Sequence, residues 1–398
     1  MPQLLPFRAL RYDPTRVSAD EVVAPPYDVV GPEQRAALAA LSPYNAIRVE
    51  APEAELDPDR YRSASLLFER WEREGILVRD SEPTLYGYRM TYKGRGGDTR
   101  STTGVMGALG LEPPGQGDVL PHERTTPKAR SDRLDLLQAT RVNTSPVWGL
   151  SMAEGLSTLI ASSGSPLFAA ESEGVLHELW ALDEATAAKV SETVAGAPVV
   201  IADGHHRWET ALAYASQQAD RSVASPSEAA LALVVELVED ELEVGPIHRL
   251  VDSALPADSL ADRLAAYFDV EPLEGDADPW RLEQSAETLG GPVLAGGGRA
   301  WLLRVRPETA EAAEEDLDSA HLAVAFDGIG GTSVTYVNNP GEVAEGLAGG
   351  LATSAVLLRA VTVAQISEVA RARRRMPPKT TFFRPKPRTG MLFRPLAD

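Results

Sequence analysis

The 398-residue sequence contains no cysteine. This absence excludes disulfide bonds, thiolate nucleophiles and metal sites built from cysteine. No apolar run approaches the roughly 18 residues that a membrane-spanning helix needs. The start of the sequence also has no charged segment followed by an apolar stretch, the pattern that directs secretion. We therefore expect a cytoplasmic protein that does not bind a membrane.

Basic residues are scarce, with 38 Lys and Arg against 58 Asp and Glu, a formal net charge of −20. This balance argues against nucleic acid and anionic membranes as partners, because both repel an acidic protein. Residues 371–398 are the exception, with nine basic side chains and one acidic side chain. We expect this tail to dock on the acidic body or on a phosphorylated ligand.

Familiar catalytic motifs are missing as well. The sequence has no Walker A motif, no set of protein-kinase signatures and no His-Glu-x-x-His zinc motif. The chain is long enough for two or three domains, and its 43% hydrophobic content is typical of a globular protein.

The most informative segment is Ile201-Ala202-Asp203-Gly204-His205-His206-Arg207. The apolar residues 198–201 predict a short buried strand, Asp203-Gly204 ends it, and a helix follows. His205, His206 and Arg207 therefore fall in the first turn of a helix, where cations are disfavoured and anions are favoured. An anionic ligand such as a phosphate would resolve this conflict.

Two further clusters combine histidine with arginine. Residues 120–133 carry four Lys or Arg side chains and several hydroxyls, with little apolar content before Leu134. Such a loop suits a polyanion, although a solvated loop leading into a capped helix is the structural alternative. The candidate phosphate-binding or catalytic residues there are His122, Glu123, Arg124, Thr125, Lys128 and Arg133; the other cluster is His248-Arg249.

Two proline-containing segments complete the candidate site. In residues 376–387, prolines hold the chain extended. In one interpretation, Lys379 and Thr380 reach a pocket formed by another part of the chain. In the other, Phe382 and Phe383 pack the tail against the body of the protein. Residues 22–30 predict two extended pieces around Pro25-Pro26, followed by Tyr27 and Asp28 as candidate substrate-binding residues.

The remaining patterns predict a mixed α/β protein. Helices are expected at 32–41 and 61–74, a hairpin at 84–111, and a strand at 45–49. We expect an N-terminal α/β domain over residues 1–225, containing the phosphate-binding box and an inserted β-rich region at about 80–190. A C-terminal α/β domain over 226–398 follows, with its basic, Pro-rich tail packing back on the site.

Four separated segments resemble the family called domain of unknown function 1015 over essentially the full length. They are residues 24–29, 122–125, 202–212 and 376–383. In addition, Asp203-Gly204-His205-His206-Arg207 resembles the Gly-x-x-Arg phosphate-binding box of the ParB/sulfiredoxin superfamily, with the free serine kinases most similar. This resemblance implies a ParB/sulfiredoxin-like core in which the box opens a helix and holds nucleotide phosphates. The chain departs from that superfamily by a long insertion, most of 49–196, and by lacking the sulfiredoxin cysteine.

The leading hypothesis is a nucleotide-dependent phosphotransferase that uses Mg²⁺ with ATP or ADP and acts on a small hydroxylated metabolite, such as free serine. The nucleotide phosphates would contact Gly204, His205, His206 and Arg207, with Thr125 as a further phosphate-binding residue. Arg124, Lys128 and Arg133 would neutralise the charge that develops on the transferred group. Asp203 or Glu123 would hold Mg²⁺, and Glu123, His122 or Asp28 would accept the hydroxyl proton. His248, Arg249, Lys379 and Thr380 would join Tyr27 in binding substrate, and a homodimer is compatible with this scheme.

Two alternatives remain open from the sequence. One is a non-catalytic, ParB-like protein that binds a nucleotide or phosphate. The other is a metal-dependent hydrolase, because His205 and Glu209 lie one helical turn apart and His122, His206 and Asp203 could complete a metal site.

Overall fold

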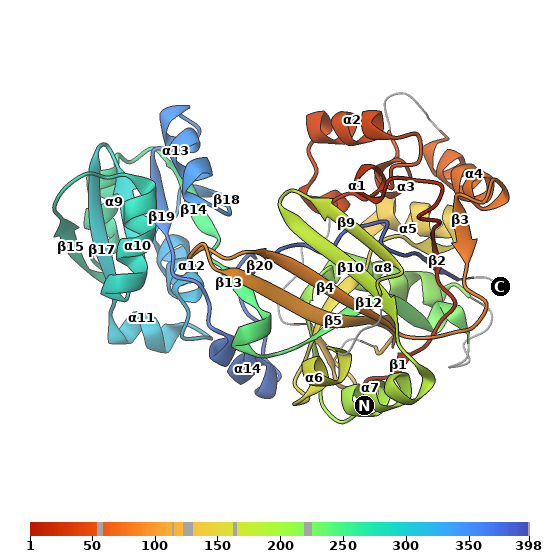
Figure 1. Ribbon diagram of the computed structural model, residues 1–398. Helices are drawn as coiled ribbons and strands as arrows, with labels where there is room; N and C mark the ends of the chain where they lie inside the picture. The colour runs from red at the N-terminus through yellow and green to blue at the C-terminus, as the bar shows by residue number, and fades with distance from the viewer. Residues whose placement is uncertain (54–58, 114, 122–129, 162–164, 219–224, 397–398) are drawn as a thin grey trace. The chain divides into compact units, whose positions relative to one another are not determined.

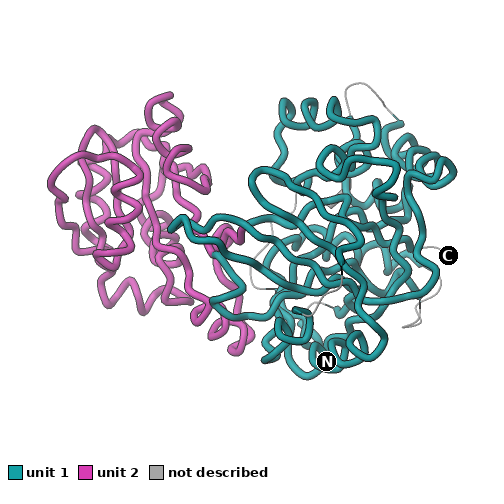
Figure 2. The backbone as a smooth tube through the Cα atoms, in the orientation of Figure 1, with its two compact units in different colours: residues 1–121, 125–243, 385–398 teal, residues 122–124, 244–384 magenta. Residues whose placement is uncertain are grey.

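The computed structural model describes residues 1–53, 59–113, 115–121, 130–161, 165–218 and 225–396. The chain divides into two compact units, shown in different colours in Figure 2. Among the described residues, unit 1 comprises those up to Glu243 together with those from Pro385 onward, and unit 2 comprises Val244–Arg384.

Unit 1 is built on a mixed sheet with strand order β6-β11-β8-β12-β5-β4-β10-β9, and β1 pairs with β5. Figure 1 labels β1, β4, β5, β9, β10 and β12 of this sheet. The pairs β11–β6 and β12–β8 are parallel, and the other pairs are antiparallel. Every residue of the central strand β12 (Ala229–Glu236) is buried, as its continuous apolar sequence predicts for a strand covered on both faces. The strands of this sheet are β1 (Leu4–Leu5), β4 (Tyr86–Lys93), β5 (Thr99–Gly110), β6 (Val119–Pro121), β8 (Val147–Ser151), β9 (Phe168–Ser172), β10 (Val175–Ala181), β11 (Val199–Asp203) and β12.

The helices of unit 1 and two short strand pairs surround this sheet. Helix α4 (Arg60–Arg73) buries Ala64, Phe68 and Trp71, which lie on one face because they are spaced three or four residues apart. The other elements are α1 (Ala19–Val22), α2 (Pro32–Leu41), α3 (Ile47–Glu50), α5 (Arg130–Thr140), α6 (Leu156–Ile160), α7 (Glu184–Ala195), α8 (His205–Ser216), and the pairs β2 (Leu10–Tyr12) with β3 (Leu77–Arg79) and β7 (Val142–Asn143) with β21 (Arg394–Pro395).

Unit 2 has its own antiparallel sheet, with order β15-β17-β16-β19-β14-β18, and its own apolar core around Leu260, Leu264 and Phe268. Its strands are β14 (His248–Ser253), β15 (Phe268–Leu273), β16 (Val293–Gly296), β17 (Arg299–Val305), β18 (Thr332–Val337), β19 (Ser354–Leu357) and β20 (Phe382–Arg384); β13 (Glu243–Gly245) begins at the last residue of unit 1. Its helices are α9 (Ala257–Leu264), α10 (Pro279–Leu289), α11 (Pro307–Ala312), α12 (Asp318–Ile329), α13 (Pro340–Ala348) and α14 (Val363–Arg371).

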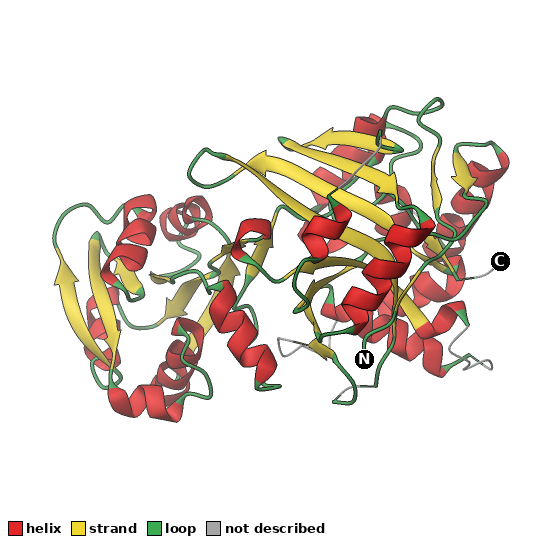
Figure 3. Cartoon of the chain, turned by 60° about the horizontal axis from the view of Figure 1, so that its bottom comes forward, coloured by secondary structure: helices red, strands yellow, loops and turns green. Residues whose placement is uncertain are grey.

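The mixed α/β class is confirmed, since helices and strands occur together throughout both units (Figure 3). The ParB-like core remains a prediction. The division between the units falls after Glu243 rather than at residues 225/226, because β12 is a central strand of the unit 1 sheet. The final residues, from Pro385, also belong to unit 1. No helix of the described residues is both long and apolar enough to cross a bilayer.

Two local predictions are wrong. Residues 45–49 do not form a strand, because the Asn45 side chain accepts a hydrogen bond from the Ile47 amide (2.9 Å) and the chain turns into α3. Residues 22–30 do not form two extended pieces either. They contain the end of α1, a single bridge between Ala24 and Thr389, and a 3₁₀ turn at Tyr27–Val29.

Candidate functional site

The predicted strand–glycine–helix segment is present in unit 1. Strand β11 ends at Asp203, and its pairing with β8 shifts register between Ile201 and Asp203, an irregularity that changes where the strand end points. Gly204 follows with φ of +82°, a left-handed conformation in which a Cβ would lie 3.0 Å from Arg207 Nε. Helix α8 then begins at His205, and its N-cap residue supplies no side-chain hydrogen bond.

Arg207 lies at the centre of an ion-pair network. Its Nη2 donates to Asp203 Oδ2 (2.9 Å) and to Asp28 Oδ2 (3.4 Å), and its Nη1 donates to the carbonyl of Pro146. The second oxygen of Asp203 accepts a 2.5 Å hydrogen bond from Lys386 Nζ, in the basic tail. The charge conflict at the start of α8 is therefore relieved by carboxylates of the chain itself.

The surroundings reinforce the charges of this network. Burial opposes ionisation of Asp203, but attraction from Lys386 and Arg207 outweighs it and holds the pKa of the carboxyl well below its ordinary value. Burial also disfavours the charged form of Arg207, whereas Asp28 and Asp203 favour it, and the pKa of the guanidinium is raised. Burial raises the pKa of the neighbouring Tyr27 phenol to about 12. At neutral pH Asp203 and Arg207 are therefore both charged, and Tyr27 is neutral.

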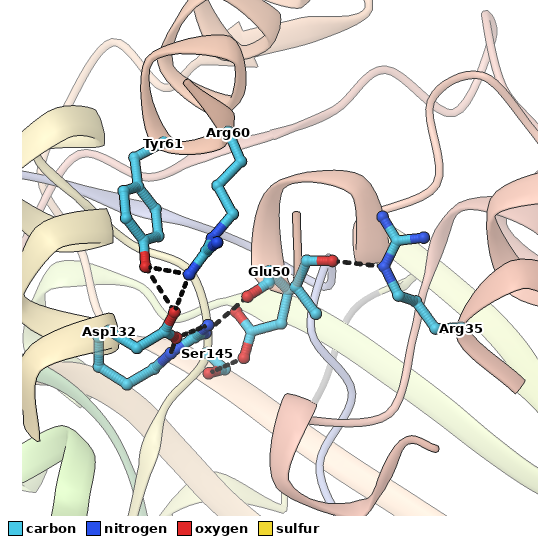
Figure 4. Close-up of polar contacts among 8 residues, drawn as sticks. Arg35, Glu50, Arg60, Tyr61, Asp132 and Ser145 are labelled. Carbon is cyan, nitrogen blue, oxygen red and sulfur yellow. Dashed lines mark hydrogen bonds and ion pairs between the residues drawn. The ribbon is translucent and has the colours of Figure 1, made fainter. Parts of the chain in front are cut away.

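A second cation, Arg133, stacks its guanidinium 4.1 Å from the centre of the Tyr27 ring. The same group donates to Asp132 Oδ2 (2.6 Å) and to the backbone carbonyl of Glu50 (2.6 Å). Arg60 and Tyr61 both point toward Asp132 (Figure 4), at 2.9 Å and 2.5 Å. Burial opposes ionisation of Asp132, but the hydrogen bond from Tyr61 and the charge of Arg133 lower its pKa to about 2.

These groups adjoin a pocket in unit 1 that contains a carboxylate missed by the sequence analysis. Glu50, at the end of α3, is fully buried, and its Oε1 accepts a 2.8 Å hydrogen bond from Ser145 Oγ (Figure 4). Its Oε2 has no hydrogen-bond partner among the described residues, and the same is true of Thr210 Oγ1 and Arg207 Nε. The lining of the pocket is Tyr27, Glu50, Arg133, Leu136, Leu137, Val142, Asn143, Thr144, Ser145, Arg207 and Thr210.

The structure brings together only part of the predicted site. Arg207 forms ion pairs with Asp28 and Asp203, and Arg133 stacks on Tyr27. Tyr27, Arg133 and Arg207 line the same pocket. His205 and His206 occupy the first turn of α8, are half-buried, and make polar or electrostatic contacts of their own. The candidates from the polar loop, His122, Glu123, Arg124, Thr125 and Lys128, lie outside the described residues.

The four remaining candidates belong to unit 2, where neighbours within that unit engage them. His248 is buried, lies 3.1 Å from Glu283 and accepts a hydrogen bond from the Leu358 amide. Arg249 donates to the carbonyls of Ile247 and Lys379. Thr380 donates to the Pro377 carbonyl. These contacts account for packing within unit 2, and the predicted substrate-binding roles remain predictions.

The donor set around Asp203 does not fit a metal ion. Both of its oxygens accept hydrogen bonds from cationic groups, Lys386 and Arg207, which would repel a dication. Across the described part of the chain, no group of three His, Asp or Glu residues is arranged to hold a metal. The assignment of Mg²⁺ to Asp203 and the metal-dependent hydrolase therefore gain no support from this geometry.

Comparison with known proteins places the chain in a family. No curated protein sequence matches it. Similar solved structures include a free serine kinase in complex with AMP (15% identity, TM-score 0.39, 67% of this chain and 84% of that chain). They also include a conserved hypothetical protein from Pyrococcus furiosus (15%, 0.38, 67% and 87%) and C-terminally truncated SbnI from Staphylococcus aureus (11%, 0.40, 70% and 82%). The model of the family described as "Protein of unknown function (DUF1015)" matches residues 4–320, and the chain belongs to this family.

Proposed function

We propose that the protein is a nucleotide-dependent phosphotransferase that acts on the hydroxyl group of a small metabolite. The observation that carries this proposal is the start of α8, where the helix begins at His205 after the N-cap residue Gly204, without a side-chain cap and near a pocket lined by Arg133 and Arg207. The first backbone N–H groups of a helix have no carbonyl partner within it and favour anions. This geometry supports a phosphate site formed by the amides of Gly204 and His205 with the side chains of His206 and Arg207.

The proposed reaction is a direct phosphoryl transfer. The acceptor hydroxyl oxygen bonds to the terminal phosphorus of ATP or ADP while the bond from that phosphorus to its bridging oxygen breaks, and ADP or AMP leaves. Phosphoryl transfer depends mainly on positioning and electrostatic stabilisation, which the charges of Arg133 and Arg207 can supply.

The proton of the hydroxyl needs a base. We propose Glu123 for this role, with His122 and Asp28 as alternatives; Glu123 and His122 lie outside the described residues. Asp203 is a positioning residue, because its oxygens hold Arg207 and Lys386 rather than facing a ligand. We assign no protein ligand to Mg²⁺, and we propose the ion only as bound to the nucleotide phosphates.

One observation favours a second candidate, a nucleotide-binding protein without catalysis. Asp203 is engaged by two cations, so it provides neither a base nor a metal ligand at the start of α8. A phosphate site of this kind would bind a nucleotide without transferring its phosphoryl group.

The test combines binding with product detection. Wild-type protein and Glu123→Gln are titrated calorimetrically with Mg-ATP and Mg-ADP, then incubated with a metabolite pool that is searched by mass spectrometry for new phosphorylated species. We expect Glu123→Gln to bind nucleotide like wild type and to lose about 10²- to 10⁴-fold in turnover, the typical effect of removing a general base. Glu74→Gln, at the C-cap of α4, serves as the control and should change neither property.

Each outcome decides between the candidates. Nucleotide binding without product, unaffected by Glu123→Gln, would establish the non-catalytic protein. Failure of wild-type protein to bind either nucleotide would exclude both candidates.

A further inference from the structure

The side chain of Glu50 is incompletely hydrogen-bonded within the pocket. The residue is fully buried, and only one of its side-chain oxygens has a partner, the neutral hydroxyl of Ser145. The guanidinium of Arg133 donates to the backbone carbonyl of Glu50 (2.6 Å) and not to its carboxylate. Among the described residues, Oε2 has no partner at all.

The other carboxylates around the pocket are each paired with a cation. Asp132 contacts Arg60 and Arg133, Asp203 contacts Lys386 and Arg207, and Asp28 contacts Arg207. The surrounding arginines are thus already engaged by other acids. Glu50 differs from its neighbours because no ion pair to it is formed by the described residues.

Burying a carboxylate oxygen without a hydrogen-bond partner is costly for a protein, since that oxygen loses its hydration and no donor replaces the water. Such a group persists where a ligand supplies the missing partner. Here Oε2 belongs to a residue that lines a pocket, together with two other unpartnered polar groups, the Thr210 hydroxyl and Arg207 Nε.

The chemistry of these groups indicates the ligand. An ammonium group would give Glu50 both the hydrogen-bond donor and the positive charge that it lacks, whereas a hydroxyl would give only the donor. The Thr210 hydroxyl and Arg207 Nε suit a second, oxygen-rich part of the same molecule. We infer that Glu50 binds the ammonium group of the substrate, which is then an amino alcohol or a hydroxylated amino acid; this rests on the proposed function for the hydroxyl.

The experiment compares pairs of ligands in which the amine of one member is replaced by hydrogen or by a hydroxyl in the other. L-Serine is paired with 3-hydroxypropionate, and 2-aminoethanol with ethylene glycol, in calorimetric titrations of wild-type protein, Glu50→Gln and Glu236→Gln. Glu236 is the matched control, a buried carboxylate whose oxygens are held by the amides of Gly155 and Ser157.

We expect wild-type protein to prefer the amine of at least one pair by about 10- to 100-fold, the effect of a hydrogen bond to a charged group. Glu50→Gln should bind both members of that pair equally, and Glu236→Gln should retain the preference. A second readout is ligand-free stability. Glu50→Gln should melt at or above the wild-type temperature because it replaces a buried carboxylate whose second oxygen has no donor, while Glu236→Gln should melt lower because it loses acceptors of backbone hydrogen bonds.

The inference is overturned if wild-type protein shows no amine preference up to tens of millimolar, or if Glu50→Gln keeps it. Nucleotide titration of the same samples separates the two proposals. Nucleotide binding and turnover without amine preference would overturn only the role of Glu50. Amine preference without nucleotide binding would overturn only the phosphotransferase.

Discussion

Replacing Arg207 by methionine should destabilise the ligand-free protein. The Arg207 side chain is only 9% exposed and its partner Asp203 20%, so water replaces little of the lost ion pair. Removing one partner of a buried pair costs about 3–5 kcal/mol. We expect the lower end, about 3 kcal/mol, because Asp203 keeps Lys386 and Asp28 is 36% exposed and can be solvated.

This magnitude is measurable by thermal unfolding. At about 2–4 °C per kcal/mol for a domain of this size, Arg207→Met should lower the melting temperature by roughly 6–12 °C. Arg207→Lys should recover part of the loss, because it keeps the charge but cannot reach Asp203 and the Pro146 carbonyl together.

Arg70→Met provides the control. Arg70 forms an exposed pair with Glu74 on α4, and its removal should cost about 0.5 kcal/mol or less. If Arg207→Met melts with or above wild-type protein, the ion pairs do not stabilise unit 1 and Arg207 is retained for a ligand instead.

Three other variants test separate parts of the structure. Gly204→Ala should lower stability by about 1–3 kcal/mol, because φ is +82° and a Cβ would crowd Arg207, and denaturant titration would measure this. Thr210→Val should leave ligand-free melting unchanged, since its hydroxyl has no described partner to lose, and a clear decrease would contradict that. Burial lowers the pKa of His177 to about 3, so the neutral histidine contributes fully to the free energy of unfolding above pH 6.5, and this contribution decreases as the pH falls from 6.5 toward 3. His177→Gln should therefore flatten the dependence of the melting temperature on pH. A slope unchanged by His177→Gln would assign it to other groups.

The strand–glycine–helix segment around residues 201–207 could be predicted from the sequence because the residues that form it are neighbours in the chain. An apolar run gives β11, an aspartate and a glycine interrupt it, and the helix α8 begins immediately afterwards. The helices at α2 and α4 and the β4–β5 hairpin are similarly local, each marked by proline, by apolar spacing or by a glycine-rich turn. These elements agree with the sequence because no distant contact has to override the local preference.

The pocket could not be predicted because its polar groups come from distant parts of the chain. Ser145 lies 95 residues from its partner Glu50. Glu50 also follows a segment that alternates like a strand, and the buried Asn45 side chain converts that segment into α3 by a hydrogen bond to the Ile47 amide. No pattern in the sequence distinguishes this glutamate from the many solvated acids of the chain.

A phosphate at the start of α8 would compete with two acidic side chains for Arg207. A phosphate bound there would have to share Arg207 with two carboxylates and would be repelled by both. The Asp28 contact is the weaker of the two, because it is longer, at 3.4 Å, and Asp28 is the more exposed acid. Asp203 is held by Lys386 as well and has a strongly lowered pKa, so it resists displacement. A phosphate that binds at Gly204 would therefore displace Asp28 rather than Asp203. We expect Asp28→Asn to strengthen phosphate binding, whereas Asp203→Asn should destabilise the protein.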